Sequence, residues 1–314
     1  IANGLVKSFD LTEAYQVPGV VKIVTCFDVP DCQFPTAGHP WSVEKKHQDI
    51  CDRKILNQRV RLYGDDIAAV IAEDEVAAAR AARLIKVEYK EYTPIVTVEA
   101  AMAEDATPLH PDLRKDNVIV HSHMTMGDSE FTYERGLEKA GSGYGSEEII
   151  SLEKEYDTPR ISHCHIELPV SWAYVDTNGK ITVVSSTQIP HIVRRVVGQA
   201  LGIPWGKVRL IKPYIGGGFG NKQDALYEPL CAWCSTMVSG RLVKLECTRE
   251  ETFVSNRVRH AIRTHIISWV RPDGTLVARK FEAFSNQGAY ASHGHGVVAK
   301  GMGAFPQLYP CDNL

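Results

Sequence analysis

The sequence predicts an α+β fold, in which strands outnumber helices and the two kinds of element do not alternate regularly. Runs of β-branched residues bounded by Gly and Pro recur along the chain and are typical of strands. Only a few segments have the apolar spacing of a helix. The length of 314 residues is enough for about two domains with sizeable cores.

The first hundred residues combine strands with one amphipathic helix. The helix is predicted at 74–85, where alanines predominate, acidic residues come first and Arg80 and Arg83 come near the end, as the helix dipole favours. Strands are predicted at 20–27, 60–63, 67–72 and 86–92. We therefore expect a small α+β domain at 1–103.

Between residues 104 and 145 the composition shifts to Pro, His, Asp, Gly and Ser, and the stretch ends in Gly-Ser-Gly-Tyr-Gly at 141–145. This composition is typical of a connector. We expect a connector at 104–145, with a short helix at 131–139, and a second domain at 146–314.

The second half places strands and helices around a run of glycines. Helices are predicted at 190–201, where Pro190 suits a first helical turn, and at 224–238. Strands are predicted at 149–156, 180–186, 208–211, 242–246, 264–270 and 275–290. The last two form a hairpin around Pro272-Asp273-Gly274. The order of these elements predicts a mixed sheet.

Composition argues against two classes of protein. The net charge is −3, with no block of Lys and Arg, so we do not expect a nucleic-acid partner. No apolar run approaches the ~18–20 residues of a membrane span, and a secretion signal is absent from the N-terminal residues. The eight dispersed cysteines favour a reduced, cytoplasmic protein. Because the chain starts at Ile1 without Met and stops at Leu314 after a turn-rich stretch, we expect a piece of a longer polypeptide.

Cys231 and Cys234 form the closest pair of cysteines in the sequence. A structural zinc or an iron–sulfur cluster would need more ligands at short spacing. No neighbouring basic residue lowers a thiol pKa, so two small apolar residues on one helix face are favoured over a redox pair.

The most informative motif is the glycine loop at 216–220, Gly-Gly-Gly-Phe-Gly. A dinucleotide fingerprint would need Gly where Asn221 stands, and a phosphate-binding Walker loop would need Gly before Lys222 and Ser or Thr after it. Both motifs fail. Two interpretations remain, a loop whose backbone N–H groups face a polar cofactor and a tight structural turn. Phe219 is expected to be held by packing.

Gln188 ends a predicted strand just before the helix that starts at Pro190. Its amide can donate to a ligand oxygen near the helix N-terminus. The alternative, favoured when the residue is considered alone, is a polar cap for local backbone groups.

Two groups of histidines could hold a metal. His163, His165 and Glu167 share one face if their segment is extended, but the apolar surroundings favour a buried strand whose polar side chains bond to neighbours. His293 and His295 lie in a glycine-rich stretch, where histidine often serves only solubility. A serine hydrolase has no support, because the G-x-S-x-G motif is absent.

Three motifs of the second half resemble the molybdenum-binding subunit of the xanthine dehydrogenase and molybdenum hydroxylase family. They are Ser-Ser-Thr-Gln at 185–188, Val-Gly-Gln-Ala-Leu-Gly-Ile-Pro at 197–204 and Ile-Gly-Gly-Gly-Phe-Gly-Asn-Lys at 215–222. Residues 146–314 resemble the first part of the molybdopterin-binding domain. Bacterial xanthine dehydrogenase molybdenum subunits are the most similar branch.

The N-terminal region resembles the a/b hammerhead domain of the same family, without its opening strand. Pro18-Gly19-Val20, Gly64-Asp65-Asp66-Ile67-Ala68 and Val87-Glu88-Tyr89 carry this resemblance. The resemblance therefore covers nearly the whole chain.

This resemblance implies a molybdenum–molybdopterin cofactor, as molybdopterin or its cytosine dinucleotide, whose metal carries oxo, sulfido and hydroxide ligands. Gln188 would hydrogen-bond a metal oxygen, and Gly218, Phe219 and Gly220 would approach that oxygen and the cofactor through backbone N–H groups. Gln188 and Phe219 are thus the expected catalytic residues and the residues nearest the metal. The family hydroxylates a carbon beside a ring nitrogen with water as the oxygen source. Electrons would leave through iron–sulfur clusters to FAD, both on partner chains.

Two departures from the family pattern bear on activity. Purine-oxidising members often have glutamate where this chain has Gln223, the expected substrate-binding residue, and a neutral amide can hydrogen-bond a purine without holding a charge. The family's substrate-orienting arginine and general-base glutamate lie beyond the position equivalent to Leu314. This chain alone is therefore expected to be inactive, with another segment or chain completing the site.

The expected reaction is the oxidation of xanthine or hypoxanthine. A hydroxylase for nicotinate, another N-heteroaromatic compound or an aldehyde is one alternative. A non-catalytic remnant or assembly module is the other, because the base is absent.

Overall fold

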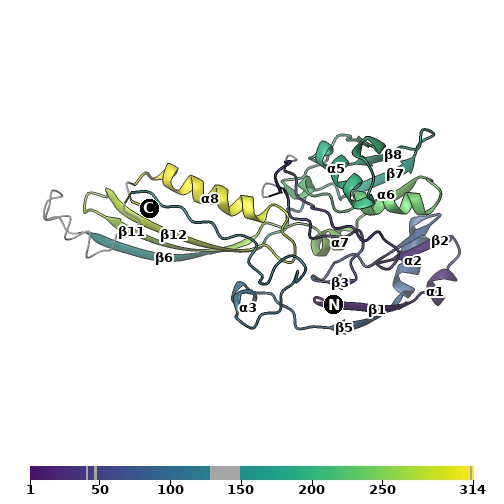
Figure 1. The fold of residues 1–314 in the computed structure, drawn as a ribbon, viewed down its shortest axis with the longest axis horizontal. Coiled ribbons are helices and arrows are strands. Elements are labelled where there is room, and N and C mark those ends of the chain that lie inside the picture. Colours follow the sequence, from purple (N-terminus) through teal and green to yellow (C-terminus); the bar gives the residue numbers. More distant parts are fainter. Residues whose placement is uncertain (40–41, 46–47, 128–148, 312) are drawn as a thin grey trace.

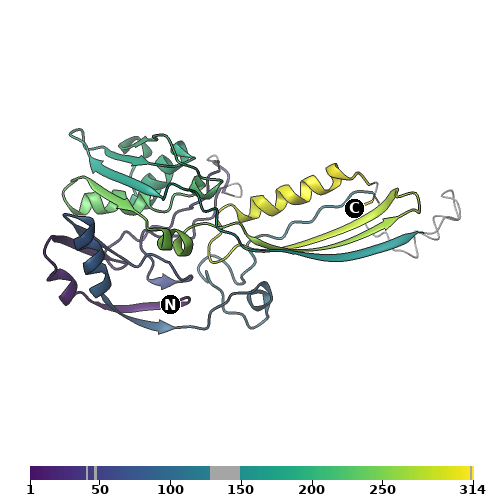
Figure 2. The same cartoon turned by 180° about the vertical axis from the view of Figure 1, so that it is seen from behind.

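The computed structural model describes residues 1–39, 42–45, 48–127, 149–311 and 313–314. The molecule is elongated, with a broad end that holds most of the helices and a narrow arm of long strands and one long helix (Figure 1). Figure 2 shows both parts from behind. Within the described residues, no helix is both long and apolar enough to cross a membrane.

Two small antiparallel sheets form the first hundred residues, one ordered β3-β1-β5 and the other pairing β2 with β4. The strands are β1 Gly4–Asp10, β2 Val20–Thr25, β3 Arg59–Val60, β4 Ala68–Ala72 and β5 Lys86–Glu91. The helices are α1 Thr12–Tyr15, α2 Glu75–Leu84 and α3 Val98–Met102. Helix α2 begins where the Asp74 carboxylate accepts a hydrogen bond from the N–H of Ala77 (2.8 Å). Its buried alanines pack against β2 and β4.

A mixed sheet ordered β10-β7-β8-β9 positions the candidate site. Its strands are β7 Val170–Val175, β8 Ile181–Ser185, β9 Val208–Ile211 and β10 Val243–Glu246. Helix α5 (Pro190–Leu201) connects β8 to the parallel strand β9 and ends at Gly202, which adopts the left-handed conformation. Helix α6 (Glu228–Met237) packs against β7 and β8. Short 3-10 turns occur at η2 Trp205–Lys207 and η3 Asn221–Gln223.

The arm is an antiparallel sheet ordered β12-β11-β6, with helix α8 running along it (Figures 1 and 2). Its elements are β6 Ile150–Thr158, β11 Ala261–Val270, β12 Leu276–Asn286 and α8 Gly294–Leu308. The Phe281 ring of β12 lies 4.6 Å from the Phe305 ring of α8, centroid to centroid, which fastens the helix to the sheet. Helix α7 (Arg249–Ser255) precedes the arm and starts with a capping box between Thr248 and Glu251.

One hydrophobic cluster crosses the broad end. Phe34 and Leu56 from the first hundred residues belong to the same cluster as Val183 of β8 and Val196 of α5. The first hundred residues therefore pack directly on the mixed sheet. The division at 103 and 145 stays a prediction.

The predicted α+β class, the mixed sheet and most of the expected strands and helices are confirmed. The strands β1 and β7 and the helices α1, α3, α7 and α8 were not predicted. Helix α8 contains several glycines and Pro306, which indicate a loop, but its packing on β12 outweighs this local preference. The second hairpin strand ends at Asn286 rather than at residue 290. The helix predicted at 131–139 lies outside the described residues.

Candidate functional site

The candidate site lies where the parallel strands β8 and β9 end. Gln188 follows β8, and the glycine loop 216–220 follows β9. Parallel neighbours present their carboxyl ends at one edge of the sheet, which is where α/β sheets commonly bind ligands. The N–H of Gln188 donates to the carbonyl of Lys222 (2.8 Å). The loop and Gln188, about thirty residues apart, are thus in direct contact.

The side chain of Gln188 lies against the glycine loop. Its Oε1 accepts a hydrogen bond from the N–H of Gly220 (3.1 Å). A Cβ on Gly218 would lie only 2.4 Å from the same oxygen, so this close approach requires glycine. Helix α5 has no side-chain cap. The interpretation of Gln188 as a cap of that helix is therefore wrong.

The middle of the loop presents backbone donors. Among the described residues, the N–H groups of Gly217, Gly218 and Phe219 have no hydrogen-bond partner. Gly217 and Gly220 have φ angles of +101° and +88°. Three consecutive unpartnered donors beside a side-chain amide suit oxygen ligands or anions, because a ligand can satisfy them where the protein does not.

Phe219 corrects one expectation. It has a φ of +51°, a conformation uncommon for a residue with a side chain, and its ring is 75% exposed. The ring is therefore not held by a packed core. Backbone strain of this kind often accompanies functional sites, and the exposed ring is accessible to a ligand or to another chain segment.

Glu167 and Lys222 connect the two ends of the loop. The Lys222 ammonium, with a side chain only 4% exposed, forms an ion pair and hydrogen bond with Oε2 of Glu167. The same oxygen accepts the N–H of Gly216 (2.9 Å). Partial burial raises the pKa of Glu167, but the hydrogen bonds from Lys222 and Gly216 outweigh it and the net pKa lies below its usual value.

The predicted metal face of His163, His165 and Glu167 does not exist. Cys164 has a φ of +49°, which interrupts the extended segment, and His165 faces the amide of Asn221 (Nε2 to Oδ1, 3.1 Å). In the described part of the chain, no group of three or more His, Cys, Asp or Glu residues is arranged to hold a metal. Of the alternative interpretation, the hydrogen bonds of the polar side chains to neighbours are confirmed, but the buried strand is wrong, because residues 162–168 form an irregular segment between β6 and β7.

Asn221 joins this segment to the chain that follows α7. Its Nδ2 donates to the carbonyl of Arg257 (2.7 Å) and lies 3.3 Å from Nδ1 of His163. Asn221 is only 2% exposed, so these buried hydrogen bonds hold the end of the glycine loop against the segments that contain His163 and Arg257.

Gln223 lies at the end of the turn η3, half-buried, with its N–H donating to the carbonyl of Gly220 (3.3 Å). The next residue, Asp224, is buried. Its carboxylate accepts from Ser292 Oγ (2.7 Å), Arg257 Nη1 (3.3 Å) and Thr36 Oγ1 (3.4 Å). Burial raises the pKa of Asp224, and Arg257 opposes that rise. Asp224 therefore ties three distant segments to the candidate site.

His293 and His295 are half-buried, so they do not lie in an exposed turn that serves solubility, and in the part of the chain that the structure describes neither belongs to a group arranged to hold a metal. His293 precedes α8, and its Nε2 accepts the N–H of Gly38 (2.8 Å) while its Nδ1 faces His39 Nε2 at 3.3 Å. The His295 ring lies 5.3 Å from that of His39, centroid to centroid. Burial lowers the pKa of His293 to about 4, so the imidazole is neutral at pH 7.

Cys231 and Cys234 are free thiols buried on α6. Burial raises both pKa values to about 12. These thiols are therefore protonated and unreactive, which confirms the structural interpretation over a redox pair.

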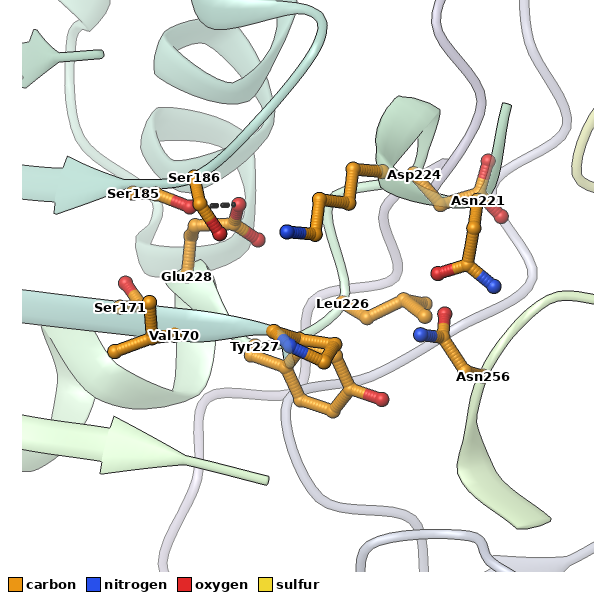
Figure 3. A pocket seen from close by; sticks show the side chains of 12 residues that line it. Val170, Ser171, Ser185, Ser186, Asn221, Asp224, Leu226, Tyr227, Glu228 and Asn256 are labelled. Atoms are coloured by element: carbon orange, nitrogen blue, oxygen red, sulfur yellow. Dashed lines mark hydrogen bonds between the residues drawn. The ribbon is translucent and has the colours of Figure 1, made fainter. Parts of the chain in front are cut away.

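A small cavity lies between Ser185, Glu228 and Asn256 and is lined by both polar and apolar residues (Figure 3). Ser185 Oγ donates to Glu228 Oε1 (2.7 Å) at one side, and burial raises the pKa of Glu228. Ser171 Oγ and Asn256 Nδ2 have no partner among the described residues. With a volume of about 20 Å³, the cavity holds at most a water molecule and cannot receive a cofactor or substrate.

A much larger cavity, of about 1060 Å³, opens beside Asp224 between α3, α7, β12 and the start of α8. Arg53, Arg61, Arg160 and Arg257 contribute to its lining. This cavity is large enough for a small-molecule ligand.

Sequence reasoning missed three residues that organise the site, Glu167 as the partner of the loop, Lys222 and Asp224. Lys222 and Asp224 flank Gln223 in the sequence, directly after the glycine loop. Because buried Lys and Asp are nearly always paired, two charged residues beside a predicted site could have been recognised as candidates for buried ion pairs.

Comparison with known proteins gives two family matches. Residues 1–93 match the model of the aldehyde oxidase and xanthine dehydrogenase a/b hammerhead domain, and residues 110–314 match that of the molybdopterin cofactor-binding domain.

Relatives with curated names agree with these matches. The chain is 44% identical to the putative xanthine dehydrogenase molybdenum-binding subunit of Escherichia coli K12, over 99% of this chain and 39% of that protein. It is 31% identical to the nicotinate dehydrogenase large molybdopterin subunit of Eubacterium barkeri, over 96% of this chain and 64% of that protein. The chain thus spans about two fifths of the first relative and less than two thirds of the second.

The aldehyde oxidoreductase of Desulfovibrio desulfuricans is a solved structure with the same fold. It superimposes with a TM-score of 0.82 at 25% identity, over 96% of this chain and 32% of that one. The chain belongs to the aldehyde oxidase and xanthine dehydrogenase family, with an a/b hammerhead domain followed by a molybdopterin cofactor-binding domain.

Proposed function

We propose that this chain is the part of a molybdenum hydroxylase subunit that presents the glycine loop and Gln188 to a molybdopterin cofactor. The observation that carries the proposal is the row of unpartnered N–H groups at 217–219 beside the amide of Gln188. These groups fit the cofactor, because oxygen ligands on molybdenum accept hydrogen bonds and a Cβ at Gly218 would obstruct the approach. When bound, the cofactor supplies hydroxylation chemistry with water as the oxygen source and accepts the electrons.

In this proposal the residues of this chain orient and stabilise. The N–H groups of Gly217, Gly218 and Phe219 act as donors held ready by the loop conformation, so that they stabilise developing negative charge on an oxygen without reorganising. The side-chain amide of Gln188 can donate hydrogen bonds from Nε2 while its Oε1 accepts the N–H of Gly220 (3.1 Å). Gln188, Gly218 and Phe219 are therefore proposed to contact the cofactor, with Gln188 and Phe219 nearest the metal, and the free N–H of Gly217 joins them. Gly220, also expected to contact the cofactor, donates its N–H to Gln188 Oε1 (3.1 Å), so its proposed part is to hold that side chain beside the cofactor.

We propose purines of the xanthine and hypoxanthine type as substrates of the complete enzyme. The 44% identity to a putative xanthine dehydrogenase subunit supports this choice. Gln223 is neutral and half-buried in the turn η3, which directly follows the loop, and it would hydrogen-bond the purine edge. Nicotinate is the second candidate, because a nicotinate dehydrogenase subunit is 31% identical over 96% of this chain.

The proposed partners are an iron–sulfur subunit, an FAD subunit and the chain or segment that supplies the general base. The cofactor form, molybdopterin or its cytosine dinucleotide, is part of the same proposal.

The test is elemental analysis of the native complex for molybdenum, followed by dye reduction with xanthine, hypoxanthine and nicotinate. Molybdenum with xanthine turnover is the expected result. Molybdenum with turnover of nicotinate alone would transfer the assignment to the second candidate. A properly matured complex without molybdenum would contradict the proposed function and favour a non-catalytic module.

A further inference from the structure

A single carboxylate contacts both ends of the glycine loop. Oε2 of Glu167 accepts the N–H of Gly216 (2.9 Å), at the start of the loop, and binds the ammonium of Lys222, just after its end. The backbone N–H of Glu167 also donates to the carbonyl of Gly216 (3.2 Å). The two ends of the loop are therefore linked through one side chain.

The partner of Glu167 is buried and also connects to Gln188. The Lys222 side chain is 4% exposed, and its carbonyl accepts from the N–H of Gln188 (2.8 Å) and from Thr187 Oγ1 (3.4 Å). Removing the charge of Glu167 would leave a buried cation without its carboxylate, which is costly. A displacement of Lys222 would therefore be transmitted to Gln188 as well as to the loop.

The position of Glu167 is itself fixed by its neighbours. Arg249 of α7 donates from Nη2 to the carbonyls of His165 (2.9 Å) and Ile166 (3.1 Å). A Cβ on Gly216 would lie 2.6 Å from Cβ of Glu167, so the loop and the carboxylate-bearing segment are in direct contact. The carboxylate thus has a rigid support.

We infer that Glu167 is a positioning residue for the glycine loop. Through Gly216 and Lys222 it holds the N–H groups of 217–219 and the side chain of Gln188 in one arrangement. It does not itself touch substrate or cofactor in this assignment. The statement that these groups face a cofactor rests on the proposed function, whereas the coupling of Glu167 to the loop does not.

The experiment is hydrogen exchange by mass spectrometry on the complete complex, comparing the native protein with Glu167→Gln. The glutamine keeps an acceptor for Gly216 but removes the charge that pairs with Lys222. We expect exchange at least tenfold faster in peptides covering 186–190 and 214–222. A peptide from 228–237 in α6 should be unchanged.

The matched control is Glu73→Gln, which breaks an exposed ion pair with Arg241 (3.0 Å) far from the loop. It should leave all these exchange rates unchanged. The double variant Glu167→Gln/Lys222→Met removes both charges and should exchange more slowly in the loop than Glu167→Gln alone, because no uncompensated cation remains. If Glu167→Gln does not fold, Glu167→Asp, which keeps the charge on a shorter side chain, should give a smaller acceleration in the same two peptides.

Unchanged exchange in the loop, or acceleration spread equally over α6, would overturn the positioning role. On an active complex, Glu167→Gln should lower kcat at least tenfold with KM changed less than twofold, because the residue does not contact substrate. Loop-specific acceleration in a complex without molybdenum would support the positioning role while contradicting the proposed function, so the two can fail separately.

Discussion

The candidate site and the arm use charged residues in opposite ways. Around the glycine loop, the charged residues Lys222 and Asp224 are buried, and each is bonded to residues far away in the sequence. In the arm, Arg263 pairs with Asp157 and Glu99 while all three side chains stay exposed. Exposed pairs contribute about 0–1 kcal/mol, whereas breaking a buried pair costs about 3–5 kcal/mol. Substitutions should therefore have specific effects at the site and small ones in the arm.

The largest expected effect is that of Gly218→Ala on activity. The new Cβ would lie 2.4 Å from Gln188 Oε1, the mobile end of a side chain, so Gln188 can turn away at little cost to folding. We expect kcat of the complex to fall about 10³-fold while stability changes by less than about 1.5 kcal/mol. Enzyme kinetics and calorimetry measure both.

Gly301→Ala in α8 is the control for that substitution. Its Cβ would meet nothing within 4 Å, and alanine favours a helix, so stability should stay equal or rise slightly and activity should not change. Normal turnover of Gly218→Ala would show that the close approach of Gln188 to the loop is unimportant for the reaction.

Gln188→Ala should slow turnover more than it lowers stability. It removes a donor near developing charge, a loss of about 10²-fold in kcat, but little core volume. The melting temperature should shift by only a few degrees, because one net hydrogen bond is worth about 1 kcal/mol. Equal losses of activity and of stability, expressed as free energies, would contradict this role.

The two regions should respond to pH with opposite signs. The pKa of His293 is lowered to about 4 by burial, so the unfolded state binds more protons between about pH 4 and 6.5, and stability falls as the pH is lowered through that window. At pH 5 this amounts to about 2 kcal/mol. His293→Asn should remove that part of the acid sensitivity in denaturant titrations at pH 5 and 7.

In the arm, hydrogen bonding to Glu153 raises the pKa of His265 above its ordinary value. Its contribution to stability is present below about pH 6.5 and is lost as the pH rises through the raised pKa. The native protein should therefore lose this contribution as the pH rises above about 6.5, and the His265→Asn variant should lack that loss in denaturant titrations on either side of that pH. The same pH profile for both variants would mean that the two histidines do not differ in this way.

The smallest expected effect is that of Phe219→Gly on stability. Glycine relieves the strain of a φ of +51°, and the ring that is lost is 75% exposed. Relief of strain and the greater freedom of glycine in the unfolded chain oppose each other, so the net change should stay within about 1 kcal/mol. A loss of several kcal/mol in chemical denaturation would indicate that the ring is packed after all.

Local patterns were sufficient for much of the fold. The apolar spacing of α5, the Gly202 that ends it and the strands on either side predicted the β8–α5–β9 unit, and this unit brings Gln188 to the glycine loop. The strand β7 and the helix α8 were missed. A short strand after a proline and a helix with several glycines have weak local signals and are stabilised by their neighbours.

The sequence by itself determined that the loop at 216–220 would allow close backbone approach, because three adjacent residues without Cβ leave that option open. It also indicated that Cys231 and Cys234 would share a helix. Only the tertiary structure decided that Glu167 holds the loop through Lys222, and that the ring of Phe219 is exposed. Helical and strand periodicity arises from residues that are neighbours in the sequence, so it can be recognised there. The partner of a buried charge depends on how segments about fifty residues apart pack together, which only the tertiary structure shows.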